Sequence, residues 1–151
     1  NSSIYRDGDL IIGGLIPVHF TSNSAQHPGA ASCGGSLHPR GYIGAEAMLY
    51  AIETINNSSE ILPYVTLGVD IKDSCGSVDY AIMECLNFDF IRTVFASEAA
   101  SSERCSCCGR KSRHTVAIVG AAFSGVTMAI ASLAGLFYIP VVSFASTSRL
   151  L

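Results

Sequence analysis

The sequence predicts an α/β fold, an open and mainly parallel sheet with helices on both faces. Short runs rich in β-branched residues alternate with stretches of helical periodicity, in the order strand, helix, strand, helix, loop, strand, helix, strand. The 151 residues are enough for one domain with a core, and no internal repeat or linker divides them. A composition that is 49% hydrophobic and 14% charged excludes a disordered chain.

The first third of the chain predicts a strand, a loop and a helix. Residues 9–20, "DLIIGGLIPVHF", form a strand rich in isoleucine and valine. Residues 21–41 are small and polar, which predicts a long surface loop. A helix follows over residues 42–59, because Met48, Ile52 and Ile55 recur at helical spacing on one face.

The middle of the chain predicts a strand and a second helix. Pro63 marks a turn, and a strand follows near residues 65–72. Ser77 has the side chain of an N-cap, which predicts a helix over residues 78–91. Residues 96–114 are polar and rich in cysteine, and we expect an irregular loop there.

The last third contains a run without charged residues, from Thr115 to Ser148. By length alone it could cross a membrane. Residues such as Gly120 and Pro140 interrupt this run and favour another interpretation. It predicts a strand over 115–119 that ends at Gly120, a helix over 126–137, and a strand over 139–144. Strands that are buried on both faces of a parallel sheet are continuously apolar, as these are.

Hydroxyl side chains follow both of these strands. Ser124 comes after the first strand and opens the next helix, while Ser146 and Thr147 come after the second. The carboxyl ends of parallel strands share one edge of a sheet, where ligands bind. A helix N-terminus and paired hydroxyls suit a ligand with a carboxylate and an ammonium group. The plainer alternative is a helix cap and an ordinary turn.

Charge and motifs exclude several classes of protein. The net charge of −3 differs from the basic footprint of a nucleic-acid-binding protein. No G-x-G-x-x-G, P-loop or G-x-S-x-G motif is present, and residues 115–151 contain no histidine that could activate Ser124. We therefore expect a binding protein, without catalytic residues, rather than an enzyme.

The six cysteines leave two interpretations open, disulfides in a secreted protein or a metal site in a cytosolic one. A zinc site could use Cys105, Cys107, Cys108 and His114, but this spacing fits no common zinc pattern. Three N-x-S sequons begin at Asn1, Asn56 and Asn57. Together with the cysteines they favour the secretory pathway.

Three stretches together carry a family resemblance: "GDLIIGGLIPVHF", "RGYIGAEAMLYAIETINNSSEILPYVTLGVDIKDSC" and "TVAIVGAAFSGVTMAIASLAGLFYIPVVSFASTSRLL". They cover most of the chain. The sequence resembles the first lobe of the extracellular Venus-flytrap domain of class C G-protein-coupled receptors. It is most similar to the calcium-sensing group, followed by metabotropic glutamate and chemosensory receptors. The resemblance implies a periplasmic-binding-protein type I fold.

The resemblance also implies site residues. Those for an α-amino-acid ligand are Ser124, Ala145, Ser146, Thr147 and Arg40. Those for a calcium ion, partly through backbone oxygens, are Ile55, Ser58, Ile61 and Leu62; no other cofactor is implied. Implied covalent features are a Cys33–Cys75 disulfide and intersubunit bonds from Cys105 and Cys107. The two overlapping sequons predict glycans at Asn56 and Asn57. Cys108 is additional to the family's pattern, and Cys85 is expected to be a buried free thiol.

Two departures from the family concern the choice of ligand. Gly44 stands where the calcium-sensing group has an aromatic residue and glutamate receptors have a basic one. Ala122 replaces a residue that bears a hydroxyl. A glycine cannot grip a distal carboxylate, so we expect neutral or bulky amino acids rather than glutamate.

The expected function is therefore ligand sensing on the extracellular side of the cell membrane. Residues 1–151 would form the N-terminal part of lobe 1, with a second lobe and a transmembrane domain beyond them. The resemblance implies signalling by lobe closure in a homodimer or heterodimer, to a G protein, and no nucleic-acid partner. The alternatives are a soluble amino-acid-binding protein of the same fold, or a chemosensory receptor of the pheromone or taste kind.

Overall fold

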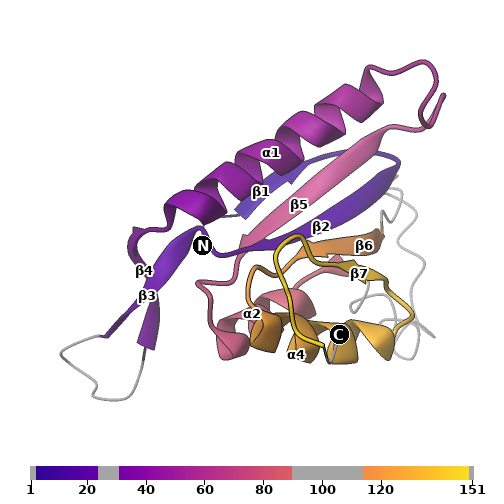
Figure 1. Cartoon of the computed structure of the whole chain (residues 1–151). Helices are drawn as coiled ribbons and strands as arrows, with labels where there is room; N and C mark the ends of the chain where they lie inside the picture. The colour runs from indigo at the N-terminus through magenta and orange to yellow at the C-terminus, as the bar shows by residue number, and fades with distance from the viewer. Residues whose placement is uncertain (1–2, 24–30, 90–113, 150–151) are drawn as a thin grey trace, which may run out of the picture.

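The computed structural model of the chain describes residues 3–23, 31–89 and 114–149 (Figure 1). Its main sheet has five strands in the order β1-β5-β2-β6-β7. The strands of this sheet are β1 (Ser3–Arg6), β5 (Leu67–Asp73), β2 (Leu10–Ile16), β6 (Thr115–Gly120) and β7 (Val141–Val142). Only the β1–β5 pair is antiparallel among them. The predicted α/β fold with a mainly parallel sheet is confirmed.

Helices cover both faces of the sheet (Figure 1). Helix α1 (Pro39–Asn56) packs on one face over β2 and β5, where Met48, Ile52 and Val69 belong to one buried cluster. Helices α2 (Val78–Leu86) and α4 (Ser124–Gly135) pack on the other face. The cluster beneath them includes Ile118 and Ile130. The central strands are therefore buried on both sides, which explains the continuous apolar sequences of β2 and β6.

Helix α1 begins three residues before the predicted start at residue 42. His38 is its N-cap, and the His38 Nδ1 accepts a hydrogen bond of 3.0 Å from the Gly41 N–H. Pro39 occupies the first helical position, where its missing N–H is not needed. The helix ends at Asn56, and the N–H of Asn57 bonds to the carbonyl of Glu53.

The prediction of one strand over 9–20 and a loop over 21–41 is wrong. Strand β2 ends at Ile16, because Pro17 has no N–H to offer and the Val18 N–H turns to the Asp73 carboxylate. Strands β3 (His19–Asn23) and β4 (Ala31–Leu37) then pair as a separate antiparallel hairpin. The polar sequence of this hairpin lacks the alternation that signals a strand.

Other elements differ from the prediction mainly in extent. The strand predicted over 139–144 is a strand at Val141–Val142 alone, and the edge strand β1 was not predicted. The helix predicted over 78–91 is described as α2, up to Leu86. Ser77 is its N-cap by position, but the Ser77 side chain makes no capping hydrogen bond. The predicted loop over 96–114 lies, apart from His114, outside the described residues.

The long uncharged run folds as β6, α4 and β7. Within the described residues, no helix has the length and apolar character to cross a membrane. Cys85 on α2 is fully buried and is a free thiol, as expected. Burial raises the pKa of this thiol from 9.0 to about 11, so it stays protonated, and therefore a poor nucleophile, at neutral pH.

Candidate ligand-binding site

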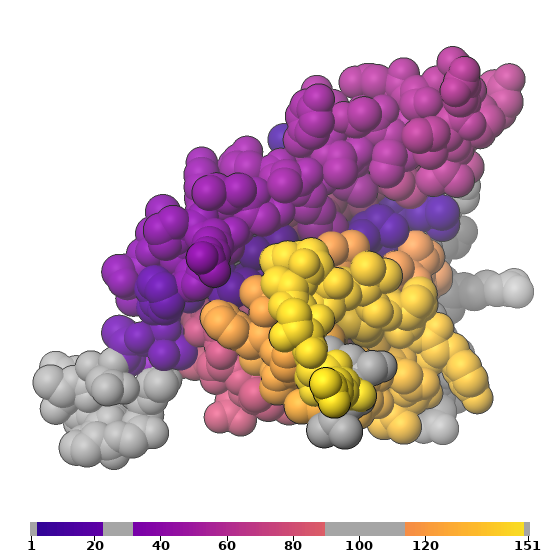
Figure 2. Space-filling model, viewed as in Figure 1, coloured from indigo at the N-terminus to yellow at the C-terminus, as the bar shows by residue number. Residues whose placement is uncertain are grey.

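The candidate site lies where the order of the strands reverses. From β2 the chain passes through α1 to β5, the neighbouring strand toward the β1 edge. From β6 it passes through α4 to β7, the neighbouring strand toward the opposite edge. Connections that leave in opposite directions open a crevice at the carboxyl ends of β2 and β6. The segment that follows β7 lies on the surface below α1 (Figure 2, yellow).

Helix α4 presents its N-terminus at this edge. Ser124 is the first helical residue, and Phe123 is the N-cap, so no side chain caps the helix. The N–H groups of the first turn of a helix have no intrahelical partners and carry a positive partial charge. This end of α4 can therefore accept a carboxylate.

The structure brings Ser124 and Thr147 together, although 23 residues separate them in sequence. The backbone N–H of Thr147 donates to the Ser124 Oγ at 3.3 Å. The hydroxyl hydrogen of Ser124 remains available to a ligand, because the hydroxyl acts as the acceptor in this bond. The sequence predicted that Ser124 and Thr147 lie at the same edge of the sheet, and in the structure they are in direct contact.

Three further hydroxyls surround the carbonyl of Ala121 beneath this contact. The hydroxyls of Thr127, Ser143 and Ser146 donate to Ala121 O at 3.1, 2.8 and 3.3 Å. Ser146 Oγ also bonds to the hydroxyls of Thr127 and Ser143. The Ser146 hydroxyl therefore points into the protein and fixes the path of the 143–147 segment.

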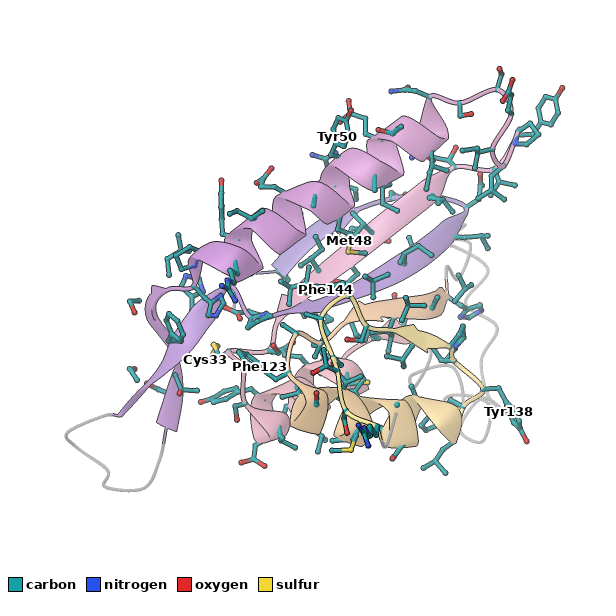
Figure 3. All side chains as sticks on the ribbon, viewed as in Figure 1. Cys33, Met48, Tyr50, Phe123, Tyr138 and Phe144 are labelled. Atoms are coloured by element: carbon teal, nitrogen blue, oxygen red, sulfur yellow. A yellow bond between two sulfur atoms is a disulfide. The ribbon has the colours of Figure 1, made fainter. Side chains whose placement is uncertain are left out.

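A glycine and a phenylalanine form one wall of the crevice. A Cβ added to Gly44 would lie 3.7 Å from Ile16 Cγ2 and 3.8 Å from Phe144 Cζ, which are ordinary contact distances. Figure 3 shows Phe144 on the C-terminal segment beneath α1. About half of Phe144 is exposed, so the ring offers an apolar surface next to the position where the family carries an aromatic or basic side chain.

A second phenylalanine lies at the start of α4. The ring centroids of Phe123 and His38 are 6.2 Å apart in a perpendicular arrangement. A Cβ on Gly76 would approach Phe123 Cε2 to 3.0 Å, so the ring also packs against the turn after β5. Phe123 is half-exposed, and it places a second apolar surface directly before Ser124.

The other residues implied for the ligand are placed as follows. Ala145 is exposed on the segment after β7, between Phe144 and Ser146. Arg40 is exposed in the first turn of α1, and its side chain makes no hydrogen bond or ion pair with another described residue. Thr127, Ser143 and the two phenylalanines were not among the predicted site residues. The signal for Thr127 was its position one helical turn after Ser124.

The residues implied for calcium lie in the turn after α1. Ser58 Oγ accepts hydrogen bonds from the N–H groups of Glu60 and Ile61, at 3.2 and 3.1 Å. The carbonyls of Ile55 and Leu62 accept from Ser58 and Val65. A hydroxyl that accepts two hydrogen bonds has used both lone pairs, so a calcium ion could bind Ser58 Oγ only by displacing one of these bonds.

The cysteines implied for an intrachain bond are joined. A disulfide links Cys33 on β4 to Cys75 after β5, with Cα atoms 5.7 Å apart. Cys105, Cys107 and Cys108 lie outside the described residues, so neither the intersubunit bonds nor the zinc alternative can be placed. Asn56 and Asn57 lie at the end of α1 and are both exposed.

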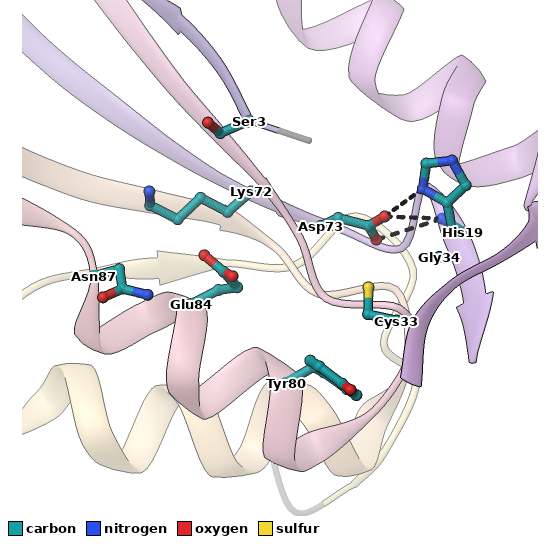
Figure 4. A pocket seen from close by; sticks show the side chains of 9 residues that line it. All are labelled: Ser3, His19, Cys33, Gly34, Lys72, Asp73, Tyr80, Glu84 and Asn87. Atoms are coloured by element: carbon teal, nitrogen blue, oxygen red, sulfur yellow. Dashed lines mark hydrogen bonds and ion pairs between the residues drawn. The ribbon is translucent and has the colours of Figure 1, made fainter. Parts of the chain in front are cut away.

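A polar hollow of about 590 Å³ lies apart from this crevice, between the carboxyl end of β5, α2 and the hairpin (Figure 4). Its lining residues are Ser3, His19, Cys33, Gly34, Lys72, Asp73, Tyr80, Glu84 and Asn87. None of the residues implied for the ligand is among them. We place the candidate site at the switch point because the uncapped helix and the Ser124–Thr147 contact are there.

The chain is similar to known proteins over nearly all of its length. The family described as "Receptor family ligand binding region" matches residues 43–151. The extracellular calcium-sensing receptor of Sus scrofa is 41% identical over 97% of this chain and 14% of its own length. The metabotropic glutamate receptor of Drosophila melanogaster is 36% identical over 99% of this chain, and metabotropic glutamate receptor 4 of Rattus norvegicus 34% over 97%.

This chain spans only 14–16% of the length of these curated relatives. The similarity nevertheless covers nearly all of the described strands and helices, including the switch point. The family match includes Ser124, Thr147 and the three residues whose hydroxyls surround Ala121 O, which are Thr127, Ser143 and Ser146. The chain therefore belongs to the family of receptor ligand-binding regions that includes the extracellular domains of class C G-protein-coupled receptors.

Proposed function

We propose that this ligand-binding receptor domain binds an α-amino acid at the switch point, on the extracellular side of a cell membrane. The observation that carries the proposal is the contact between Ser124 Oγ and the Thr147 N–H at the uncapped start of α4. A carboxylate there would accept from the Ser124 hydroxyl and from the first N–H groups of the helix. The ammonium group would donate to backbone carbonyl oxygens of the 145–147 segment. The Ser146 hydroxyl points into the protein, so in this segment the backbone carbonyls, and not that hydroxyl, would accept from the ligand.

The walls of the crevice support a neutral ligand with an apolar side chain. Phe123 directly precedes Ser124, Phe144 lies next to Gly44, and both rings are about half exposed, while Gly44 contributes no charge. An apolar side chain gains free energy when it leaves water against such rings. An acidic side chain would lose hydration there without a cationic partner.

A binding role also fits the chemistry of the hydroxyls better than catalysis does. In the described structure they bond to one another, to a carbonyl and to a backbone N–H, rather than to a histidine or a carboxylate. A serine nucleophile needs an adjacent base. We therefore propose that Ser124 binds and does not react.

The proposal is tested by titrating a panel of amino acids against the complete ectodomain. We expect neutral amino acids to bind. Ser124→Ala should weaken binding because it removes the hydroxyl that donates to the carboxylate, and Thr147→Ala should weaken it because it removes the exposed hydroxyl next to that contact. Losing a hydrogen bond to a charged ligand group costs about 1.5–3 kcal/mol, which is about ten- to a hundredfold in affinity. Ser132→Ala is the matched control, since this serine lies on the same helix and its hydroxyl bonds only to the Met128 carbonyl at 2.9 Å. Unchanged binding in both site variants, or binding of acidic amino acids alone, would contradict the proposal.

Calcium binding at Ile55, Ser58, Ile61 and Leu62 also stays a proposal. It requires the turn to rearrange, because the Ser58 hydroxyl already accepts from two N–H groups. Calcium prefers six to eight oxygen ligands, with carboxylates prominent among them. None of these four residues has a carboxylate, so we derive no step of the mechanism from this ion.

We further propose that the receptor works as a dimer, with closure of a second lobe passed to a membrane domain and a G protein. Apolar side chains on the outer side of α2 support an interface there: Val78, Met83 and Leu86 are all exposed. Exposed apolar groups on neighbouring turns of one helix are typical of an interaction surface. Disulfides from Cys105 and Cys107 would make such a dimer covalent.

Replacing Cys105 and Cys107 together with serine is expected to convert the dimer into a monomer on a non-reducing denaturing gel. A denaturant removes noncovalent contacts, so only intersubunit disulfides can preserve the dimer band. Cys85→Ala is the control, because this thiol is fully buried and should leave the band unchanged. A dimer that survives the double substitution would assign the bond to Cys108, and stoichiometric zinc in the purified protein would favour a metal site.

A further inference from the structure

Two sequons overlap at the end of α1, and the structure treats their asparagines differently. One runs from Asn56 to Ser58, and the other from Asn57 to Ser59. We propose that Asn57 carries an N-linked glycan and that Asn56 is a structural residue that stays unmodified. The inference rests on the extracellular location in the proposed function, since the modification occurs in the secretory pathway.

The side chain of Asn56 holds the end of α1 to the start of β5. Asn56 Nδ2 donates to the Leu67 carbonyl at 2.9 Å, and the Leu67 N–H donates to Asn56 Oδ1 at 2.8 Å. Leu67 is the first residue of β5 and is buried. One planar amide thus pairs with both polar groups of one residue. Such a pair uses the Nδ2 hydrogen that lies on the same side as Oδ1.

Glycosylation would remove that particular hydrogen from Asn56. In the transfer, Nδ2 forms a bond to the anomeric carbon of a lipid-diphosphate-linked oligosaccharide. The bond from that carbon to the phosphate oxygen breaks, the lipid diphosphate leaves, and Nδ2 loses one proton. The product is a secondary amide, which prefers the trans form and so places the sugar on the same side as Oδ1. The sugar would take the place of the hydrogen that donates to Leu67.

Asn57 is free of this constraint. Its side chain is exposed and makes no hydrogen bond within the described structure, and only its backbone N–H is engaged in ending the helix. The hydroxyl acceptors differ in the same way. Ser58, in the first sequon, accepts from Glu60 and Ile61, whereas the exposed Ser59 of the second sequon makes no hydrogen bond with a described residue. Both ends of the Asn56 sequon are therefore engaged, and both ends of the Asn57 sequon are accessible.

The test uses a matched pair of serine variants in the complete ectodomain, secreted from a eukaryotic cell. Ser59→Ala removes only the Asn57 sequon, and Ser58→Ala removes only the Asn56 sequon. Enzymatic removal of glycans in heavy-oxygen water, followed by peptide mass spectrometry, identifies the asparagine that was modified. We expect a glycan on Asn57 in the wild type and in Ser58→Ala, and no glycan on this peptide in Ser59→Ala.

Other outcomes overturn the inference. A glycan on Asn56 in the wild type or in Ser59→Ala would show that the two hydrogen bonds to Leu67 do not keep this side chain unmodified. A wild-type peptide without any glycan would show that Asn57 is not used. The amino-acid titration on the same protein is independent of both results. An ectodomain that binds amino acids without a glycan on Asn57 sinks only this inference, whereas one with the glycan and no ligand sinks only the proposed function.

Discussion

Replacing Asp73 with alanine is expected to destabilise the lobe by about 3–5 kcal/mol, the usual cost of breaking a buried charged network. Asp73 ends β5 and is 8% exposed. Its Oδ1 accepts from the N–H groups of Val18 and Cys75, both at 2.9 Å. Its Oδ2 accepts from the His19 N–H at 3.1 Å and lies 2.6 Å from the His19 ring Nδ1 (Figure 4). Alanine would leave the N–H groups of His19 and Cys75 without this acceptor, whereas the Val18 N–H would keep its 3.0 Å bond to the Ile16 carbonyl.

The effect is expected to reach the ligand site, because Asp73 fixes the start of the hairpin. Val18, which lies between β2 and β3, also accepts at its carbonyl from the N–H of His38 at 2.7 Å. His38 caps α1, and its ring touches Phe123 at the start of α4. A loosened hairpin would thus disturb the two helix ends that form the crevice.

Thermal unfolding of the secreted ectodomain measures the change. A loss of 3–5 kcal/mol corresponds to a fall of about 6–20 °C in the melting temperature of the lobe. Asp9→Ala is the control: its exposed carboxylate accepts one N–H, that of Thr66 at 2.9 Å, and should cost about 1 kcal/mol or less. Asp73→Asn keeps an acceptor oxygen but loses the charge, so its melting temperature should lie between the other two. Equal melting temperatures for Asp73→Ala and Asp9→Ala would contradict the assignment.

The sequence predicted the elements whose signals are local. Strands β2 and β6 are continuous apolar runs because both of their faces are buried, and α1 has a helical stripe that contains Met48 and Ile52. The hairpin β3–β4 was missed because its polar sequence has no alternation and because the bonds that attach it to the rest of the lobe come from elsewhere in the chain. Asp73 is more than 50 residues from the groups that it binds in β3, and no window of sequence shows that pairing.

The candidate site divides in the same way. The ends of β6 and β7 follow from the strand pattern, which is why Ser124 and Thr147 could be placed together in advance. The hydroxyls around Ala121 O could not, since Ser143 and Ser146 reach it only through the turn of the chain after β7. The apolar wall depends on Phe144 lying opposite Gly44, a contact across 100 residues that neither residue signals by itself.

Removal of the Cys33–Cys75 disulfide is expected to cost about 4 kcal/mol. The bond closes a loop with a sequence separation of 42, and a closed loop of this length restricts the unfolded chain by about that amount. Serine at both positions avoids a stray thiol and nearly preserves the side-chain size. Replacing the buried free thiol, Cys85→Ser, is a control for the loss of cysteine alone, although the buried hydroxyl that it introduces has its own cost.

The disulfide and Asp73 hold the same junction, so their effects should not be independent. Asp73 binds the His19 N–H at the start of β3, and the Cys33–Cys75 disulfide holds β4. Each strand of the hairpin thus has one tether to the end of β5, and the two tethers are linked because Asp73 Oδ1 accepts from the N–H of Cys75. With either tether in place the hairpin stays attached to β5. With both removed it should detach, and the loss should exceed the sum of the single effects, because residues that share a network couple by about 0.5–3 kcal/mol. Limited proteolysis within residues 19–37 in the single and combined variants measures this. If the cleavage rate of the combined variant rises only by the product of the two single-variant fold-increases, the free energies are additive and the two tethers act separately.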